Sequence, residues 1–212
     1  MVLNFLFGKK EQRPVKPIIE HVDPRVKMGE VSIKLRILVD KLQRSYDTLV
    51  NKKDQLFERV VRAEAEKDRD RAAVYASEIV QVKKIARTIL VAVTTLEKVV
   101  LRLDTVKEAI EAKEILSSPE LGVLRPLTEQ LRGVMPEVSL ELGKINENLE
   151  EAMMSFGTID SYNYVPEVRD QDVQSILKEA SEVAVQRMKT SFPELPATSR
   201  ETERAQATQN TW

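Results

Sequence analysis

The chain has 212 residues, of which 42% are hydrophobic, 32% are charged and only 5% are aromatic. This length and apolar content suffice for a buried core, and abundant charge with few aromatics is typical of long helices packed on one another. The absence of cysteine excludes a disulfide scaffold, a thiolate zinc site and a cysteine nucleophile. It also fits a reducing compartment, so we expect a cytoplasmic protein.

The net charge of −1 conceals a gradient along the chain. Residues 1–62 carry 14 Lys+Arg against 8 Asp+Glu, whereas residues 141–212 carry 7 against 13. The basic N-terminal part and the acidic C-terminal part can attract each other within one chain or between chains. A chance gradient on a solvated surface is the alternative interpretation.

Residues 1–29 are predicted to be a membrane-binding segment and a linker. Five large apolar residues are followed at once by two lysines: Val2, Leu3, Phe5, Leu6, Phe7, Lys9 and Lys10. The apolar run is too short for a signal peptide, and its positive charge lies on the wrong side. Prolines separate it from the first helix, so a membrane wedge is one interpretation. Docking of the segment on its own helical bundle is the other.

Residues 30–117 are predicted to form a long antiparallel helical hairpin, because neither Gly nor Pro occurs between Glu30 and Ser118. In the first helix, 30–66, the apolar positions follow a spacing of threes and fours: Val31, Leu35, Leu38, Leu42, Tyr46, Leu49, Leu56, Val60 and Ala63. The same spacing returns in the second: Ile79, Val82, Ala86, Ile89, Val93, Leu96, Val100, Leu103 and Ile110. The charged run Glu64–Arg71 is the expected turn. A strand competes for the β-branched second segment, but period 2 fails there.

Shorter helices follow, predicted at 119–132, 136–156 and 168–190. The first of these helices has a suitable start, with Ser118 as its N-cap and with Pro119 and Glu120 in its first turn. The domain prediction is a helical core over 30–156, a linker and regulatory helix over 157–190, and a disordered tail over 191–212, which is polar. The fold class is therefore all-α. The longest uncharged stretch of the helical part, Thr88–Leu96, is far below the roughly 20 residues of a membrane span.

Enzymatic motifs are lacking, so we expect no catalytic activity, no metal and no cofactor. The single histidine, His21, lies between prolines in an expected loop and cannot form a triad or a zinc site alone. Gly8-Lys9-Lys10 and Gly143-Lys144 lack the upstream glycine of a phosphate-binding loop. No E-x-x-H di-metal pattern occurs.

Three blocks resemble the ESCRT-III superfamily, in particular its archaeal cell-division branch, the CdvB family. They are DQLFERVVRAEAEKDRDRAAVYASEI (Asp54–Ile79), KKIARTILVAVTTLEKVVLRLDTV (Lys83–Val106) and LFGKK (Leu6–Lys10). The resemblance covers roughly residues 30–155 and is strongest over 54–106. It implies a closed monomer that opens, polymerises on membranes with itself and with paralogous subunits, and is disassembled by an AAA ATPase whose MIT domain grips the C-terminal region.

The sequence departs from that family in two places. The residues after Thr190 are too few and too polar for the C-terminal winged-helix element of longer members, so the chain looks like a short paralogue. The helical MIT-binding pattern is poorly matched: Arg187-Met188 supplies its central pair, but Ala184 and Ser191 replace the flanking leucines. Phe192, Pro193, Leu195 and Pro196 resemble the proline-containing type of motif, with a plain linker as the alternative.

The first helix is expected to separate its charges by sign at 100° per residue. A basic strip comprises Lys34, Lys41, Arg44, Lys52, Arg59 and Arg62. An acidic strip comprises Asp40, Asp47, Asp54 and Glu58. Such strips suit binding of anionic lipid or side-by-side pairing of identical hairpins; an ordinary solvated helix is the alternative. A repeated contact that does not close gives a filament.

The prediction is a non-enzymatic, membrane-remodelling filament subunit acting in cell division, peripherally bound to the membrane at the division site. A passive coiled-coil scaffold or adaptor is the alternative. Near-neutral charge without interleaved basic and aromatic residues argues against a nucleic-acid partner.

Overall fold

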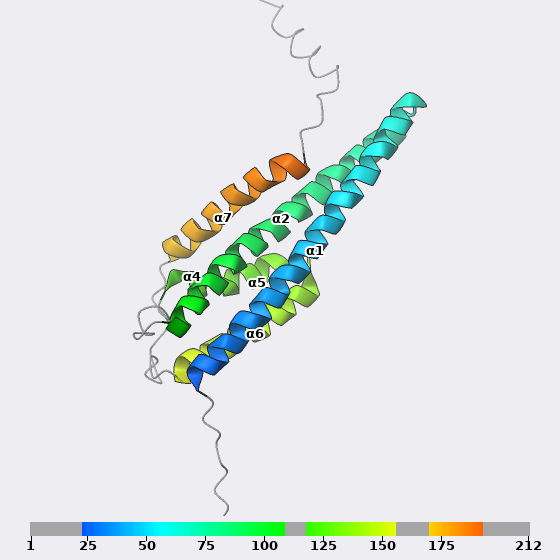
Figure 1. The fold of residues 1–212 in the computed structure, drawn as a ribbon. Coiled ribbons are helices and arrows are strands. Elements are labelled where there is room, and N and C mark those ends of the chain that lie inside the picture. The colour runs from blue at the N-terminus through cyan, green and yellow to red at the C-terminus, as the bar shows by residue number, and fades with distance from the viewer. Residues whose placement is uncertain (1–22, 109–117, 156–169, 193–212) are drawn as a thin grey trace, which may run out of the picture.

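A computed structural model describes residues 23–108, 118–155 and 170–192 of the chain. Within these ranges the secondary structure is helical and no strand occurs. The helices in chain order are α1 (Pro24–Ala65), α2 (Arg69–Glu108), α4 (Pro119–Gly122), α5 (Leu124–Arg132), α6 (Pro136–Ser155) and α7 (Asp170–Ser191). The all-α prediction, with a long hairpin followed by shorter helices, is confirmed (Figure 1).

Helix α1 begins earlier than predicted. Asp23 is its N-cap, with the carboxylate accepting a hydrogen bond from the Arg25 N–H at 2.9 Å, and Pro24 occupies the first turn. The expected start after Gly29 was wrong, because this glycine lies buried inside the helix and does not end it. A single glycine costs an interior helical position only about 1 kcal/mol, which tertiary packing offsets.

The turn between α1 and α2 lies inside the predicted charged run. Lys67 has a φ of 59°, in the left-handed region, and the N–H of Asp68 returns to the Ala63 carbonyl at 2.9 Å. The Asp68 carboxylate then accepts from the Arg71 N–H at 3.1 Å, which caps the start of α2. A non-glycine residue thus adopts the left-handed conformation of the turn. The charged run predicted the position of this turn, although the run contains no glycine.

The predicted apolar stripes form the hairpin interface. On α1, Leu35, Leu38 and Leu42 are no more than 1% exposed, and on α2, Leu96 and Leu103 are fully buried. The tip of the hairpin extends beyond the shorter helices (Figure 1). The two long helices therefore form a rod, and the rest of the described chain packs against its base.

The helix predicted over 119–132 is broken into α4 and α5. Pro126 has no N–H for the carbonyl of Gly122, four residues earlier, and its ring clashes there. The chain therefore breaks at Val123, between the two helices. Ser118 lies at the expected N-cap of α4, but its side chain makes no capping hydrogen bond.

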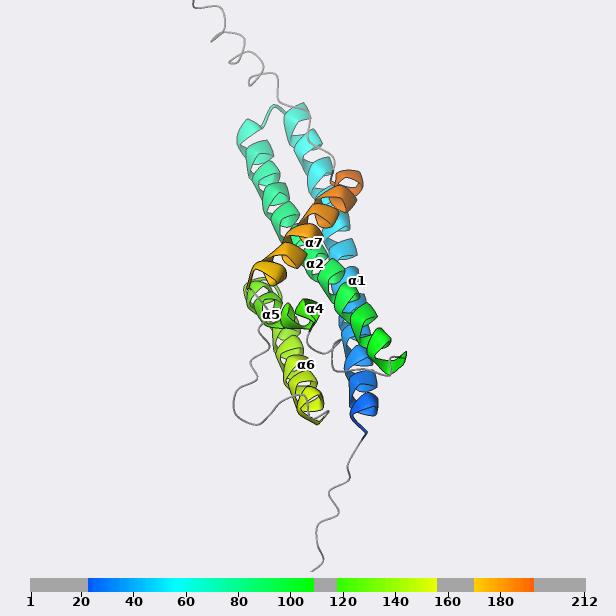
Figure 2. The same cartoon turned by 90° about the vertical axis from the view of Figure 1, so that its left-hand side faces the viewer.

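Helices α5 and α6 form an antiparallel pair against the base of the hairpin, with α6 on α1 and α5 on α2. The Ser139 hydroxyl donates to the Thr128 carbonyl at 2.9 Å, which ties α6 to α5. Helix α7 lies on α2, away from α6 (Figures 1 and 2). Figure 2 shows α7 crossing α2 so that its C-terminal end approaches α1.

Candidate functional site: the α7 clasp and the charged side of α1

Helix α7 contacts the hairpin through a narrow apolar stripe with a spacing of four residues. Its buried side chains are Ala180, Ala184 and Met188, and Phe192 follows directly after the helix. Val173, Ile176 and Leu177, earlier on the helix, are only half-buried. Two of the four buried side chains are alanine, so α7 buries little apolar area for its length.

Phe192 anchors the end of α7 against α1. Its ring centroid lies 6.3 Å from that of Tyr46, at an angle of 58°, and 5.6 Å from the Lys53 ammonium. Lys53 also donates a hydrogen bond to the Ser191 carbonyl at 2.8 Å, which satisfies the last turn of α7. The Tyr46 hydroxyl, by contrast, is buried with no hydrogen-bond partner among the described residues. An unsatisfied buried hydroxyl costs about 1–3 kcal/mol, which weakens the docking of Phe192.

Polar contacts between α7 and α2 supplement this anchor. Lys98 Nζ lies 2.7 Å from Glu179 Oε2, and the Arg87 guanidinium donates to the Ser181 hydroxyl at 3.0 Å. A third contact has the opposite polarity, with Arg187 Nη1 lying 3.5 Å from Glu97 Oε2. The expected attraction of acidic α7 to a basic hairpin therefore accounts for only part of the contact.

The residues predicted to bind an MIT domain fall on both sides of the described boundary. Met188 is 5% and Phe192 3% exposed, so both are covered in this conformation, whereas Arg187 is exposed. Pro193, Leu195 and Pro196 lie outside the described residues. Phe192, predicted to lie in the disordered tail 191–212, is buried. The signal was present, because Phe192 continues the four-residue spacing of the α7 stripe.

Three ion pairs join α6 to α1. Lys41 Nζ lies 2.8 Å from Glu141 and 3.8 Å from Glu137, and Lys27 lies 2.7 Å from Glu151. The hydrogen bond from Lys41 to Glu141, with the charges of both glutamates, raises the pKa of Lys41 above its ordinary value of 10.5. The hydrogen bond and positive charge of Lys27 lower the pKa of Glu151 below its ordinary value of 4.5. Lys41, predicted to contact lipid or a neighbouring subunit, is thus already engaged within the chain.

Two further members of the basic strip contact α2. Lys52 Nζ lies 2.8 Å from Glu78 Oε1, and the Arg59 guanidinium lies 5.9 Å from the centroid of the Tyr75 ring. Both side chains remain exposed. These contacts stabilise the half of the hairpin nearer its tip. The two side chains are therefore less available to a binding partner than the sequence suggested.

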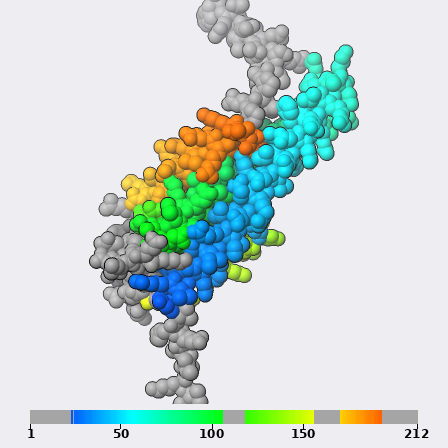
Figure 3. Space-filling view, in the orientation of Figure 1, coloured from blue at the N-terminus to red at the C-terminus, as the bar shows by residue number. Residues whose placement is uncertain are grey.

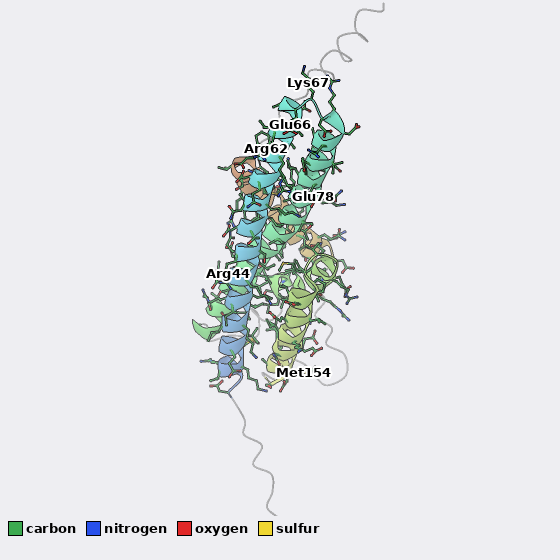
Figure 4. The ribbon with its side chains drawn as sticks, turned by 90° about the vertical axis from the view of Figure 1, so that its right-hand side faces the viewer. Arg44, Arg62, Glu66, Lys67, Glu78 and Met154 are labelled. Atoms are coloured by element: carbon green, nitrogen blue, oxygen red, sulfur yellow. The ribbon has the colours of Figure 1, made fainter. Side chains whose placement is uncertain are left out.

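The remaining basic residues face outward. Lys34, Arg44 and Arg62 are exposed, and none of them forms an ion pair within the part of the chain that the structure describes. Arg44 and Arg62 are 18 residues apart, which is about five full turns, so they project in the same direction. Figure 4 shows both on α1, with Glu66 and Lys67 at the turn, Glu78 on α2 and Met154 on α6.

The acidic strip is also partly engaged. Asp54 lies 2.6 Å from Lys53, the residue that holds the end of α7, and Asp47 accepts a hydrogen bond from Gln43. Asp40 and Glu58 are exposed and form neither an ion pair nor a side-chain hydrogen bond among the described residues. Figure 3 shows the side of α1 that remains uncovered by other described helices from its start toward the hairpin tip.

The predicted membrane-binding residues Val2, Leu3, Phe5, Leu6, Phe7, Lys9 and Lys10 lie outside the described residues. Within residues 23–108, 118–155 and 170–192, no helix has the length and apolar character needed to cross a bilayer. Across the same ranges, no group of three or more His, Asp or Glu side chains is placed to hold a metal ion.

The described chain defines a class: an all-helical hairpin with a fixed α5–α6 pair and a weakly docked C-terminal helix. It is 38% identical over 176 residues to Cell division protein B1 of Sulfolobus acidocaldarius, an alignment covering 82% of each chain. It is 32% identical over 194 residues to Cell division protein B of the same organism, covering 92% of this chain and 71% of that one. No protein-family model and no solved structure matches the chain. The chain belongs to the family of these cell division proteins B and B1.

Proposed function

We propose that this protein is a membrane-remodelling filament subunit of the ESCRT-III class that acts in cell division. The family membership supports the role in cell division. In this proposal the protein has no catalytic activity of its own. It polymerises with itself and with paralogous subunits on the cytoplasmic face of the membrane at the division site, and an MIT-domain AAA ATPase disassembles the polymer.

The observation that carries the proposal is the uncovered side of α1, where charges of both signs that form no ion pair among the described residues face outward along a rigid rod. Lys34, Arg44 and Arg62 supply the positive charges, and Asp40 and Glu58 the negative ones. Such a surface is complementary to a shifted copy of itself, so identical hairpins can pair side by side. Because a shifted contact does not close, it extends into a filament.

Residues 2–10 would supply the attachment to the membrane. With about 1 kcal/mol per partly buried apolar side chain and about 1 kcal/mol for each lysine near anionic lipid, one segment contributes roughly 5–7 kcal/mol. That is weak for a single molecule. In a polymer many segments bind together, and the effective concentration of each is raised by its neighbours. Assembly and membrane binding would therefore reinforce each other.

Helix α7 would regulate this assembly as a clasp. Its release exposes Met188 and Phe192, which stand at the start of the proposed MIT-binding segment and are covered in the closed monomer. The same movement would thus uncover the side of α2 beneath α7 and present the segment to the ATPase.

The test is electron microscopy and co-sedimentation of the full chain with anionic vesicles, compared with a variant carrying Asp40→Lys, Asp47→Lys and Glu58→Lys. Each exposed pair is worth only about 0–1 kcal/mol, but three repulsive contacts recur at every subunit and should abolish filaments. We leave Asp54 unchanged because it contacts Lys53, which holds α7.

A matched control reverses three exposed acidic residues outside α1 and α7: Asp70, Glu147 and Glu150. Both variants have the same net charge, so only the position of the change differs. Filaments of normal length from the α1 variant would refute side-by-side pairing through this surface. A wild-type chain that neither sediments with vesicles nor forms filaments would favour the passive scaffold.

A further inference from the structure

A groove of about 580 Å³ runs between α1 and α2 on a face that no other described helix lines. Val39 of α1, with Val100 and Leu101 of α2, gives it an apolar lining. Leu101 is 71% exposed, the highest value among the large apolar side chains of the described residues. An apolar segment lying in this groove would remove the Leu101 side chain from water, which is favourable.

The rim of this groove is acidic. It carries Asp40, Glu97 and Asp104 against the single basic residue Arg36, which pairs with Asp104. Glu97 lies 3.5 Å from Arg187 of α7. Asp40 makes no ion pair within the described part of the chain. Among the described residues Asp40 is therefore the uncompensated negative charge of the rim, and it favours an occupant that combines apolar side chains with lysine or arginine.

Residues 2–10 of the same chain have that composition. Five large apolar side chains are followed directly by Lys9 and Lys10, in a region with excess positive charge. The α1 wall of the groove lies near Val39, 16 residues beyond Asp23, which is about 24 Å along the helix. Residues 8–22, fully extended, span up to about 50 Å. The segment therefore reaches the groove, and its covalent attachment gives it a high effective concentration there.

We propose that residues 2–10 dock in the groove between α1 and α2 in the closed monomer, with apolar side chains against Leu101 and the lysines beside the acidic rim. The regulatory consequence rests on the proposed function. Residues 2–10 are hidden in the groove in the free monomer, and at the membrane they leave the groove and bind anionic lipid. The docking itself does not depend on any membrane role.

The cysteine-free chain permits a direct test by disulfide trapping. The trapped variant carries Asn4→Cys and Leu101→Cys, which preserves all five apolar residues of the segment. The control carries Asn4→Cys and Leu140→Cys. Leu140 is 70% exposed. Its neighbour Glu141 pairs with Lys41 of α1, so Leu140 lies at about the same position along the hairpin axis as the groove. Lys41 is five residues from Arg36, about 140° around α1, so the control tests a different face.

Intramolecular disulfide formation is followed in dilute full-length protein under mild oxidation, by non-reducing electrophoresis and peptide mass spectrometry. Docking predicts formation at least about tenfold faster at Leu101→Cys than at Leu140→Cys, because docking raises the local concentration of one thiol near the other. Adding Lys9→Glu and Lys10→Glu should reduce this difference. Equal rates at the two positions would overturn the proposal. Faster formation of disulfide-linked dimers through Leu101→Cys would overturn it in favour of a second copy as the occupant.

Vesicle sedimentation then separates this inference from the proposed function. If both hold, the oxidised Leu101→Cys variant fails to bind anionic vesicles and regains binding on reduction. If the disulfide forms rapidly but the reduced and wild-type proteins never bind vesicles, the docking stands and the proposed membrane role fails. If the oxidised variant binds vesicles as well as the reduced one, the groove does not hide the anchor and the regulatory inference is wrong.

Discussion

Helices α6 and α7 both lie against the hairpin and both form ion pairs with it, yet their apolar contacts differ greatly. The α5–α6 pair buries a continuous set of large side chains: Leu124, Leu127, Leu131, Val138, Leu142, Ile145 and Leu149. Helix α7 buries two alanines, one methionine and the phenylalanine that follows it. Because burial of apolar area contributes far more than exposed ion pairs, α5–α6 belongs to the permanent core, whereas α7 can detach without unfolding it.

The largest expected effect comes from removing one core leucine of α6. Leu142→Ala should lower the free energy of unfolding by about 3 kcal/mol and the Tm by about 6–12 °C, because Leu142 is fully buried. Thermal unfolding followed by circular dichroism measures this. Leu140→Ala is the control, since Leu140 is on the same helix but 70% exposed, and it should change stability by less than about 0.5 kcal/mol. Equal effects of the two substitutions would mean that α6 is not part of the core.

A smaller and local effect is expected at the end of α7. Phe192→Ala removes the aromatic anchor, so backbone amides of α7 should exchange hydrogen about ten- to a hundredfold faster while those of α1 and α2 keep their rates. Tyr46→Phe should act in the opposite direction, because it removes a buried hydroxyl that has no hydrogen-bond partner among the described residues. Hydrogen-exchange mass spectrometry measures both. If Phe192→Ala destabilised the whole hairpin, α7 would belong to the same cooperative unit as α6.

The smallest expected effect concerns the ion pairs of α6. The pKa of Glu151 is lowered in the folded protein, so its stabilisation is present above the ordinary value of 4.5 and is lost as the pH falls through the lowered value. Lys41 has a raised pKa, so its contribution is present below 10.5 and is lost as the pH rises through the raised value. Glu151→Gln should therefore slightly reduce the Tm near neutral pH, and this difference should shrink as the pH falls through the lowered pKa of Glu151. A large decrease in Tm at neutral pH would show that ion pairs, and not apolar burial, hold α6.

The sequence predicted the hairpin well because its evidence is local: a long stretch without Gly or Pro, and apolar residues every three or four positions. The errors arose where a single residue was interpreted alone. Gly29 does not bound α1 but lies buried inside it. Phe192 is buried, although prolines follow it in the sequence. Pro126 was overlooked as the cause of the break at Val123. In each case packing from another helix, or a backbone hydrogen bond four residues away, decided the outcome.

The charge strips show the same limit. The position of each charge around α1 follows from the helical repeat, and Arg44 and Arg62 face outward as expected. The engagement of Lys41 by α6 and of Lys52 by α2 depends on which sides of α1 those helices cover. One amphipathic helix does not reveal where its neighbours pack, so the available part of each strip emerges only from the assembled fold.

The proposed regulation requires that α7 act as a clasp that restrains assembly. The direct measurement is the protein concentration needed for assembly on anionic vesicles, by sedimentation and electron microscopy, for the full chain and for a chain lacking residues 168–212. A chain lacking only 193–212 is the control, because it retains α7 and Phe192. We predict that the longer deletion assembles at a concentration at least about tenfold lower than the control, since the side of α2 that α7 covers is exposed in every molecule. A deletion that stays monomeric, or that assembles at the same concentration as the control, would contradict the clasp.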